Sequence, residues 1–64
     1  MTIDKIIFYL GKEQAQFLGK LPKTKLLYMM QELQRELKYI KLPNNILFKY
    51  KIELNYIKYL LELN

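Results

Sequence analysis

Residues 48–56 read FKYKIELNY, and apolar and polar side chains alternate along this stretch without a break. Successive side chains of a β-strand point to opposite faces, so such alternation places every apolar residue on one face. The stretch therefore predicts a strand with one buried and one exposed face. We expect the strand to span Ile46 to Leu54. It should follow a turn at Pro43-Asn44-Asn45, because asparagine tolerates left-handed backbone.

Residues 24–41 have a different period, which is typical of an amphipathic helix. Thr24 is the expected N-cap of this helix, and Pro43 forbids continuation beyond about Lys41. The apolar residues recur at steps of three and four, so they form one stripe on a helix surface. The stripe consists of Leu26, Met30, Leu33, Leu37 and Ile40.

The N-terminal segment from Ile3 to Leu10 is rich in isoleucine and aromatic residues and ends at a glycine. This composition predicts a strand buried on both faces, with a short helix as the alternative. A helix is predicted next, from Lys12 to Lys20, because Gly19 and Pro22 break the apolar pattern there.

The segment from Tyr56 to Leu63 is expected to pair with the preceding strand through a tight turn at Leu54-Asn55, although a helix also fits it. The predicted fold class is therefore α+β, a small antiparallel sheet with two N-terminal-half helices packed on it, in the order β-α-α-β-β. We expect one domain over residues 1–64. The tripeptide Lys-Leu-Pro occurs at 20–22 and at 41–43, and we interpret this as coincidence, because the segment that follows is predicted helical once and extended once.

Composition restricts the chemistry available to the chain. A domain of 64 residues is marginally stable without help, and the absence of cysteine and histidine removes disulfides and the usual metal ligands, so we expect no metal and no cofactor. The formal net charge of +5 favours a polyanion: a nucleic acid, an acidic protein or an anionic membrane surface. The longest apolar run, Ile6 to Leu10, is too short to span a bilayer, and no signal peptide is evident. We therefore expect a cytoplasmic protein without a membrane partner.

Several motifs resemble a known family. Phe8-Tyr9, Gly11-Lys12 and the segment from Phe17 to Pro22, followed by a long amphipathic helix, resemble the opening of the RelE/ParE toxin superfamily, especially its phage-derived HigB-like branch. Residues 48–52 and 57–61 are similar to the second and third strands of that branch. Family members carry arginine in place of Lys51 and Lys58, and they continue into a fourth strand and a tail. The resemblance thus implies a relative that is shortened at the C-terminus.

What the resemblance implies is the toxin of a type II toxin-antitoxin system, a ribosome-dependent and metal-independent mRNA endonuclease or a shortened relative. The implied catalytic residues are Lys51, Lys58 and Tyr59. In the predicted hairpin Lys51 pairs with Lys58, which brings their Cβ atoms within about 5 Å and places positive charge for a developing phosphorane. Basic residues expected to bind nucleic acid are Lys12, Lys20, Lys23, Lys25 and Lys49. The implied partners are an antitoxin and mRNA or the ribosome, in a hetero-oligomer or a homodimer.

Two other functions stay open at this point. One is a non-catalytic interaction module, such as a phage- or plasmid-encoded inhibitor, that holds an acidic protein or nucleic acid on a basic face. The other is a gyrase-directed toxin of the ParE type, which shares the predicted fold. The singled-out lysines also fit ordinary solvated surface positions, and most of the six tyrosines fit core packing.

Overall fold

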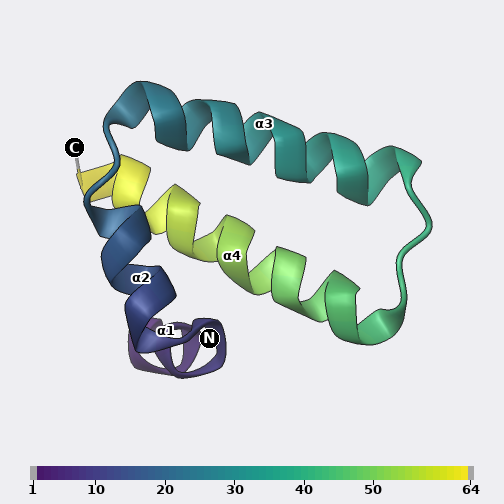
Figure 1. The fold of residues 1–64 in the computed structure, drawn as a ribbon, viewed down its shortest axis with the longest axis horizontal. Helices are drawn as coiled ribbons and strands as arrows, with labels where there is room; N and C mark the ends of the chain where they lie inside the picture. Colours follow the sequence, from purple (N-terminus) through teal and green to yellow (C-terminus); the bar gives the residue numbers. More distant parts are fainter. Residues whose placement is uncertain (1, 64) are drawn as a thin grey trace.

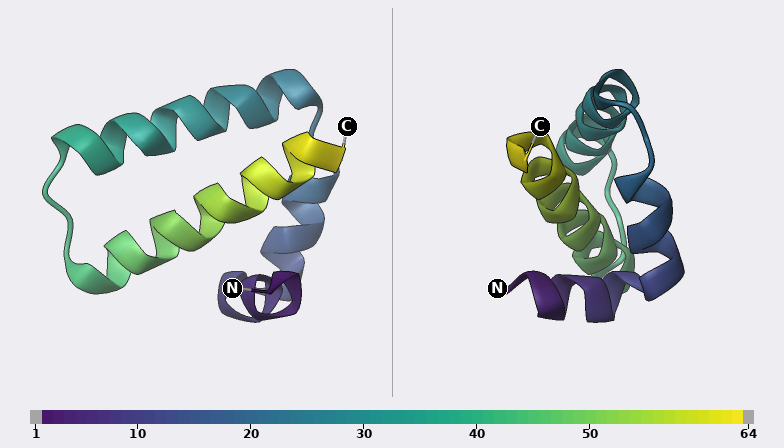
Figure 2. Two further views of the ribbon diagram at one scale, coloured as in Figure 1. Left: turned by 180° about the vertical axis from the view of Figure 1, so that it is seen from behind. Right: turned by 90° about the vertical axis from the view of Figure 1, so that its left-hand side faces the viewer.

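The computed structural model describes residues 2–63, which form four helices (Figure 1). They are α1 (Ile3–Leu10), α2 (Lys12–Gly19), α3 (Lys23–Tyr39) and α4 (Asn44–Leu63). Helices α3 and α4 lie antiparallel as a hairpin, and α1 and α2 pack on another side of α4 (Figure 2). No strand occurs within residues 2–63, so the predicted α+β fold with its antiparallel sheet is wrong. The domain is all-helical, with α4 in contact with each of the other three helices.

The alternating stretch 48–56 is helical because a helix that is buried on two sides also produces alternation. Neighbouring residues on an α-helix are about 100° apart around the axis, so two residues separated by one other are about 200° apart. Consecutive members of the alternating set therefore lie on nearly opposite sides of the helix. The alternating set consequently separates into two stripes with a spacing of four residues. Phe48 and Ile52 belong to one stripe and line a hollow together with Tyr9 and Leu10 of α1, whereas Tyr50 and Leu54 belong to the stripe on the opposite side of the helix. The same helix continues to Leu63, so the predicted hairpin is wrong and the helical alternative for residues 56–63 is confirmed.

Prolines set the beginning of the two long helices. The carbonyl of Pro22 accepts a hydrogen bond from the Leu26 N–H at 3.1 Å, and the carbonyl of Pro43 accepts one from the Leu47 N–H at 2.9 Å. A proline lacks the N–H that a helix interior needs, but its carbonyl can accept the first helical bond, and the residue before a proline is kept out of helical geometry. Both Lys-Leu-Pro tripeptides therefore precede a helix. The prediction that an extended segment follows the second tripeptide is wrong.

Two local predictions at these helix starts change accordingly. Helix α3 begins at Lys23 with Pro22 at the N-cap and without a side-chain cap, so Thr24 lies in the first turn and is not the cap. Asn44 and Asn45 are the first residues of α4, so the predicted turn does not include them. Helix α3 ends at Tyr39, two residues before the predicted end.

At the N-terminus, residues 3–10 adopt the helical alternative, and the predicted strand is wrong. The Thr2 hydroxyl caps α1 by accepting a hydrogen bond from the Lys5 N–H at 3.4 Å. Gly11 then separates α1 from α2 with a φ of 101°, a value that L-residues with a side chain rarely adopt. Its N–H donates to the Ile7 carbonyl at 2.9 Å, and its own carbonyl accepts from the Ala15 N–H at 2.9 Å. The predicted helix over Lys12 to Lys20 is confirmed as α2.

The core lies where all four helices meet, and each contributes at least one buried apolar side chain. Within residues 2–63 no polar side chain is buried. The predicted apolar stripe of α3 is confirmed except for its last member, because Ile40 lies beyond the helix end and is 52% exposed. The buried residues are Ile6, Ala15, Leu18, Leu26, Leu33, Ile52, Leu54, Tyr56 and Ile57.

We expect Leu33→Asp to unfold the domain and Gln34→Asp to leave it folded. Leu33 is only 8% exposed, so an aspartate there would be buried without a partner, at a cost of about 3 kcal/mol or more. Gln34, the next residue, is exposed and should tolerate the same charge within about 0.5 kcal/mol. Urea unfolding followed by far-UV circular dichroism measures both changes. Equal stability of the two variants would contradict the assigned face of α3.

The two glycines should respond in opposite directions to alanine. Gly11→Ala places a Cβ on a positive φ and should destabilise the protein by about 1–2 kcal/mol. Gly19→Ala falls in the last residue of α2, where a Cβ meets no atom within 4 Å, and should stabilise the helix by about 0.5 kcal/mol. Thermal unfolding of both variants provides the measurement. Unchanged stability in Gly11→Ala would contradict the geometry of the α1–α2 junction, and a loss of stability in Gly19→Ala would contradict the helical placement of Gly19.

Candidate functional site

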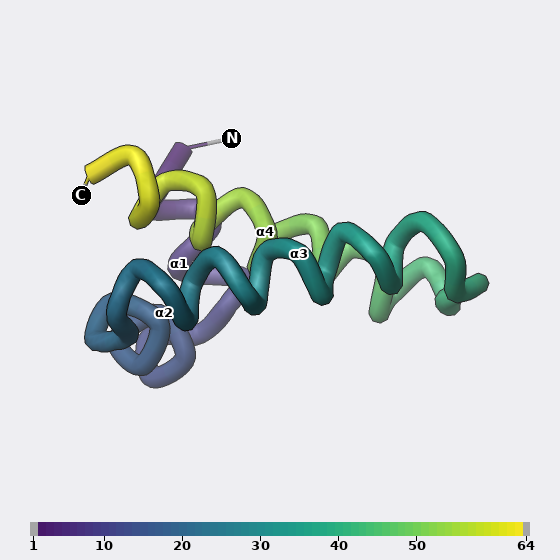
Figure 3. The backbone as a smooth tube through the Cα atoms, turned by 90° about the horizontal axis from the view of Figure 1, so that it is seen from above, coloured from purple at the N-terminus to yellow at the C-terminus, as the bar shows by residue number. Residues whose placement is uncertain are grey.

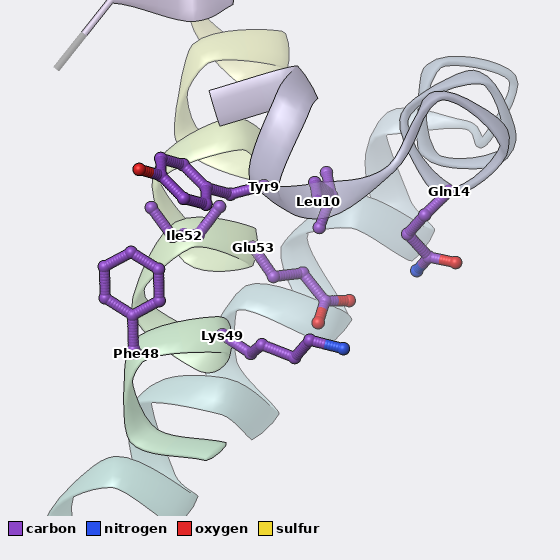
Figure 4. Close-up of a pocket in the computed structure, with 7 residues that line it drawn as sticks. All are labelled: Tyr9, Leu10, Gln14, Phe48, Lys49, Ile52 and Glu53. Carbon is purple, nitrogen blue, oxygen red and sulfur yellow. The ribbon is translucent and has the colours of Figure 1, made fainter. Parts of the chain in front are cut away.

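A groove of about 230 Å³ lies between α1, the first turn of α2 and the middle of α4 (Figure 4). Its apolar base is formed by Leu10 and by Ile52, which is only 3% exposed. Tyr9 and Phe48 stand at one end of the groove, and Gln14 lies at the other (Figure 4). The groove is lined by Tyr9, Leu10, Gln14, Phe48, Lys49, Ile52 and Glu53.

Three exposed aromatic residues form a continuous edge beside the groove, which we call the aromatic rim: Phe8, Tyr9 and Phe48. Phe8 and Tyr9 meet edge-to-face with ring centroids 5.5 Å apart, and Tyr9 and Phe48 do so at 5.4 Å. Edge-to-face contact is a favourable arrangement for aromatic rings, so α1 and α4 hold the rim in place together. Even so, Phe8 is 79% exposed and Phe48 is 45% exposed. Clustered apolar exposure of this kind marks an interaction site.

The other end of the groove is polar. Lys49 and Glu53 lie one turn apart on α4, and Gln14 reaches the groove from α2. Burial raises the pKa of the Glu53 carboxyl above its usual value, and the side chain of Gln14 lowers it by a smaller amount. A carboxyl group whose pKa is shifted by burial at the edge of a cavity is a common feature of functional sites. The groove thus combines an apolar end with hydrogen-bond donors and acceptors at its other end.

The three residues predicted to be catalytic do not come together. Lys51 and Lys58 both lie on the exposed face of α4, but they are two helical turns apart, which is about 10.5 Å along the axis. The cross-strand pairing that would bring them close is absent, because both residues belong to one helix. Tyr59 is half-buried and stacks on Tyr56, with ring centroids 6.1 Å apart. None of these residues lines the groove.

The lysines predicted to bind nucleic acid are exposed but are spread over both ends of α2, the start of α3 and the first half of α4. Lys20, Lys23 and Lys25 surround the connection between α2 and α3, near the C-terminal end of α4 (Figure 1). Lys12 begins α2, so the length of that helix, about 12 Å, separates it from Lys20. Lys49 belongs to the groove in the first half of α4. A single basic patch formed by all five is therefore not present.

Sequence reasoning missed most of the groove. Lys49 was singled out, but for nucleic acid, whereas the aromatic and carboxylate residues around it were not. On a helix, Phe48 with Ile52 and Lys49 with Glu53 are pairs spaced by four residues and thus neighbours, a signal that the strand interpretation of residues 48–56 concealed. Tyr9 comes from the other end of the chain, and spacing alone does not reveal such a contact.

Replacement of Glu53 by glutamine should change how stability depends on pH. Burial raises the folded-state pKa of this carboxyl above 4.5, its ordinary value in an unfolded chain. Just above pH 4.5 the folded protein therefore binds more protons than the unfolded chain, and Glu53 lowers stability as the pH rises through that window. Glu53→Gln removes this loss. We expect the variant to melt higher than the wild type at pH 7 and to lose the advantage below about pH 4. Glu62→Gln, at an exposed carboxylate of the same helix, is the control; a gain at pH 7 equal to that of Glu53→Gln would contradict the assignment.

Two further observations limit how the site is interpreted. Within residues 2–63, no helix combines the length and the apolar character that crossing a bilayer requires. No family model matches this chain, and comparison with curated proteins and with solved structures finds no match either. The function is consequently argued from the geometry of the groove and the surface.

Proposed function

We propose that this protein is a non-catalytic interaction module that binds a peptide segment of a protein partner in the groove between α1 and α4. The observation that carries the proposal is the aromatic rim beside an apolar base, with Lys49 and Glu53 at the polar end. Interfaces between proteins are enriched in exposed aromatic anchors beside well-packed pockets. The rim and the groove together provide both.

The size of the groove favours a side chain over a small-molecule ligand. Sites for cofactors and drug-sized molecules are about 300–1,000 Å³ and enclose most of the ligand. The groove, at about 230 Å³, is smaller than this range and open to solvent on one side. It can accommodate one large apolar side chain against Leu10 and Ile52, while the rest of the partner stays outside.

The polar end of the groove indicates that the large apolar side chain belongs to a peptide. The carboxylate of Glu53 accepts hydrogen bonds, the ammonium of Lys49 donates them, and the amide of Gln14 does both. A peptide presents an apolar side chain together with one N–H donor and one C=O acceptor on its own backbone. An apolar molecule without such groups would shield the Glu53 carboxyl from water without adding a hydrogen bond to it, which is costly.

The charge of the chain favours an acidic partner. With a formal net charge of +5, the protein attracts negatively charged segments and repels basic ones over about one Debye length. Acidic residues beside the apolar anchor would lie near Lys49, which lines the groove and is exposed. Their contribution would be mainly to the association rate and would weaken as salt increases.

The toxin hypothesis receives no support from the groove. The mRNA endonuclease activity, the antitoxin partner and the gyrase alternative stay predictions from the resemblance alone. The strands on which that resemblance depended are parts of α4, and Lys51 and Lys58 face solvent on it. The interaction module, which the sequence left open as an alternative, is therefore the function that we propose.

A selection experiment tests the proposal. A phage-displayed library of random peptides is selected on the intact protein, and we expect enriched peptides to share one large apolar residue flanked by acidic ones. Phe48→Ala should weaken the binding of these peptides about tenfold or more, because a central aromatic contact typically contributes at least 1.4 kcal/mol. Fluorescence polarisation with a labelled synthetic peptide measures the affinity.

Phe17→Ala is the matched control, because Phe17 is 55% exposed, lies on α2 and does not line the groove. We expect this variant to bind the selected peptides within about twofold of the wild type. Circular dichroism verifies that both variants are folded. A library that yields no shared motif, or peptides that lose equal affinity with both substitutions, would contradict the proposed site.

A further inference from the structure

The end of the α3–α4 hairpin has an unbalanced charge. Between Leu37 and Ile52 the chain carries four lysines and no aspartate or glutamate, whereas the remainder carries seven basic and six acidic residues. Almost all of the net positive charge therefore belongs to the end of α3, the connection and the first half of α4. The connection between α3 and α4 and the helix ends next to it extend beyond α1 and α2 (Figure 3).

The same end exposes large apolar side chains. Tyr39 is 73% exposed, Ile40 is 52% exposed and Ile46 is 38% exposed. The ammonium of Lys38 lies over the Tyr39 ring at 5.4 Å from its centroid, so a positive charge and an aromatic face are presented side by side. We call this surface the basic tip: Lys38, Tyr39, Ile40, Lys41 and Ile46.

We propose that the basic tip docks on an anionic membrane surface, with Tyr39 and Ile40 entering the headgroup region and the lysines beside the lipid phosphates. The positive charge of the basic tip favours an anionic partner. Its exposed apolar side chains favour a lipid surface over other anionic partners. Tyrosine favours the boundary between headgroups and acyl chains. A branched aliphatic side chain finds an apolar environment in a membrane, whereas nucleic acid binding uses stacking on planar groups, which isoleucine lacks.

Surface docking does not need a membrane-spanning helix. Apolar insertion and lysine contacts with anionic lipids act together, and neither alone gives stable binding. Each lysine near an anionic surface strengthens partitioning about fivefold, so two of them account for about 25-fold. The tip is also separate from the groove, since none of its residues lines it. This proposal therefore does not rest on the proposed function.

Vesicle co-sedimentation tests the inference. The intact protein is mixed with vesicles of phosphatidylcholine alone or with about one-fifth phosphatidylglycerol, at about 0.15 M salt. We expect binding only to the anionic vesicles. The double variant Lys38→Gln/Lys41→Gln should partition about 25-fold more weakly, and Ile40→Ser about fivefold more weakly. Absence of binding to the anionic vesicles, or equal binding to both kinds, would overturn the proposal.

Matched controls separate a docking surface from simple charge attraction. Lys23→Gln/Lys25→Gln removes the same charge at the other end of α3, about 20 Å away and more than two Debye lengths from the tip. Partitioning of this variant to anionic vesicles should weaken by less than about threefold. An equal weakening by both pairs of lysine substitutions would overturn the proposal. The chain has no tryptophan, so Tyr39→Trp provides a fluorescence probe that should shift to the blue with anionic vesicles.

Tryptophan fluorescence also distinguishes docking on a membrane from binding of nucleic acid. Tyr28→Trp, at a 63% exposed site in the middle of α3, should show no shift. A short single-stranded RNA serves as the competing ligand at the same salt concentration. Binding of this RNA that is lost in Tyr39→Ala, without a blue shift of Tyr39→Trp on vesicles, would assign the tip to nucleic acid and overturn the membrane proposal.

Discussion

The structure depends on one constraint: α4 has to be apolar on two sides at once. Its stripe toward α3 closes the helical hairpin, and its stripe toward α1 holds the short N-terminal helices. Each of those helices has only eight residues, too few to be stable as an isolated helix in water, so they gain their order by packing. A chain of 64 residues without disulfides has one core, and α4 passes through the middle of it.

This constraint also determines what the surface presents. Because two sides of α4 are buried, its lysines lie either on the remaining exposed side of the helix or at the polar end of the groove. The groove lies where α1 meets α4, between Tyr9 and Leu10 of α1 and the four-residue pairs Phe48–Ile52 and Lys49–Glu53 of α4. The hairpin end lies outside the contact region of α1 and α2, which leaves Tyr39 and Ile40 exposed. Groove and tip are thus two results of the same packing arrangement.

The sequence predicted α2 and α3, but it did not predict α1 or α4 as helices. The α3 stripe, the α2 boundaries and the glycine junction could be inferred because their periods and breaking residues have one interpretation. Residues 48–56 have two interpretations. A strand with one buried face and a helix with two buried sides both give a sequence in which apolar and polar residues alternate. Pro43, directly before that stretch and in the same tripeptide as Pro22, was the available evidence for a helix start. The groove could not be predicted, because Tyr9 and Phe48 meet only through the helical packing.

The single-residue junction at Gly11 has a consequence for local motion. Helix α1 is joined to α2 by this one residue, and its contacts with α4 bring together segments far apart in the sequence. A terminal segment of a domain can open at lower free energy than the global unfolding of that domain. Because α1 supplies Tyr9 and Leu10, its detachment would dismantle one wall of the groove. A ligand seated there would thus slow hydrogen exchange of the α1 amides, which links occupancy of the groove to the order of the N-terminus.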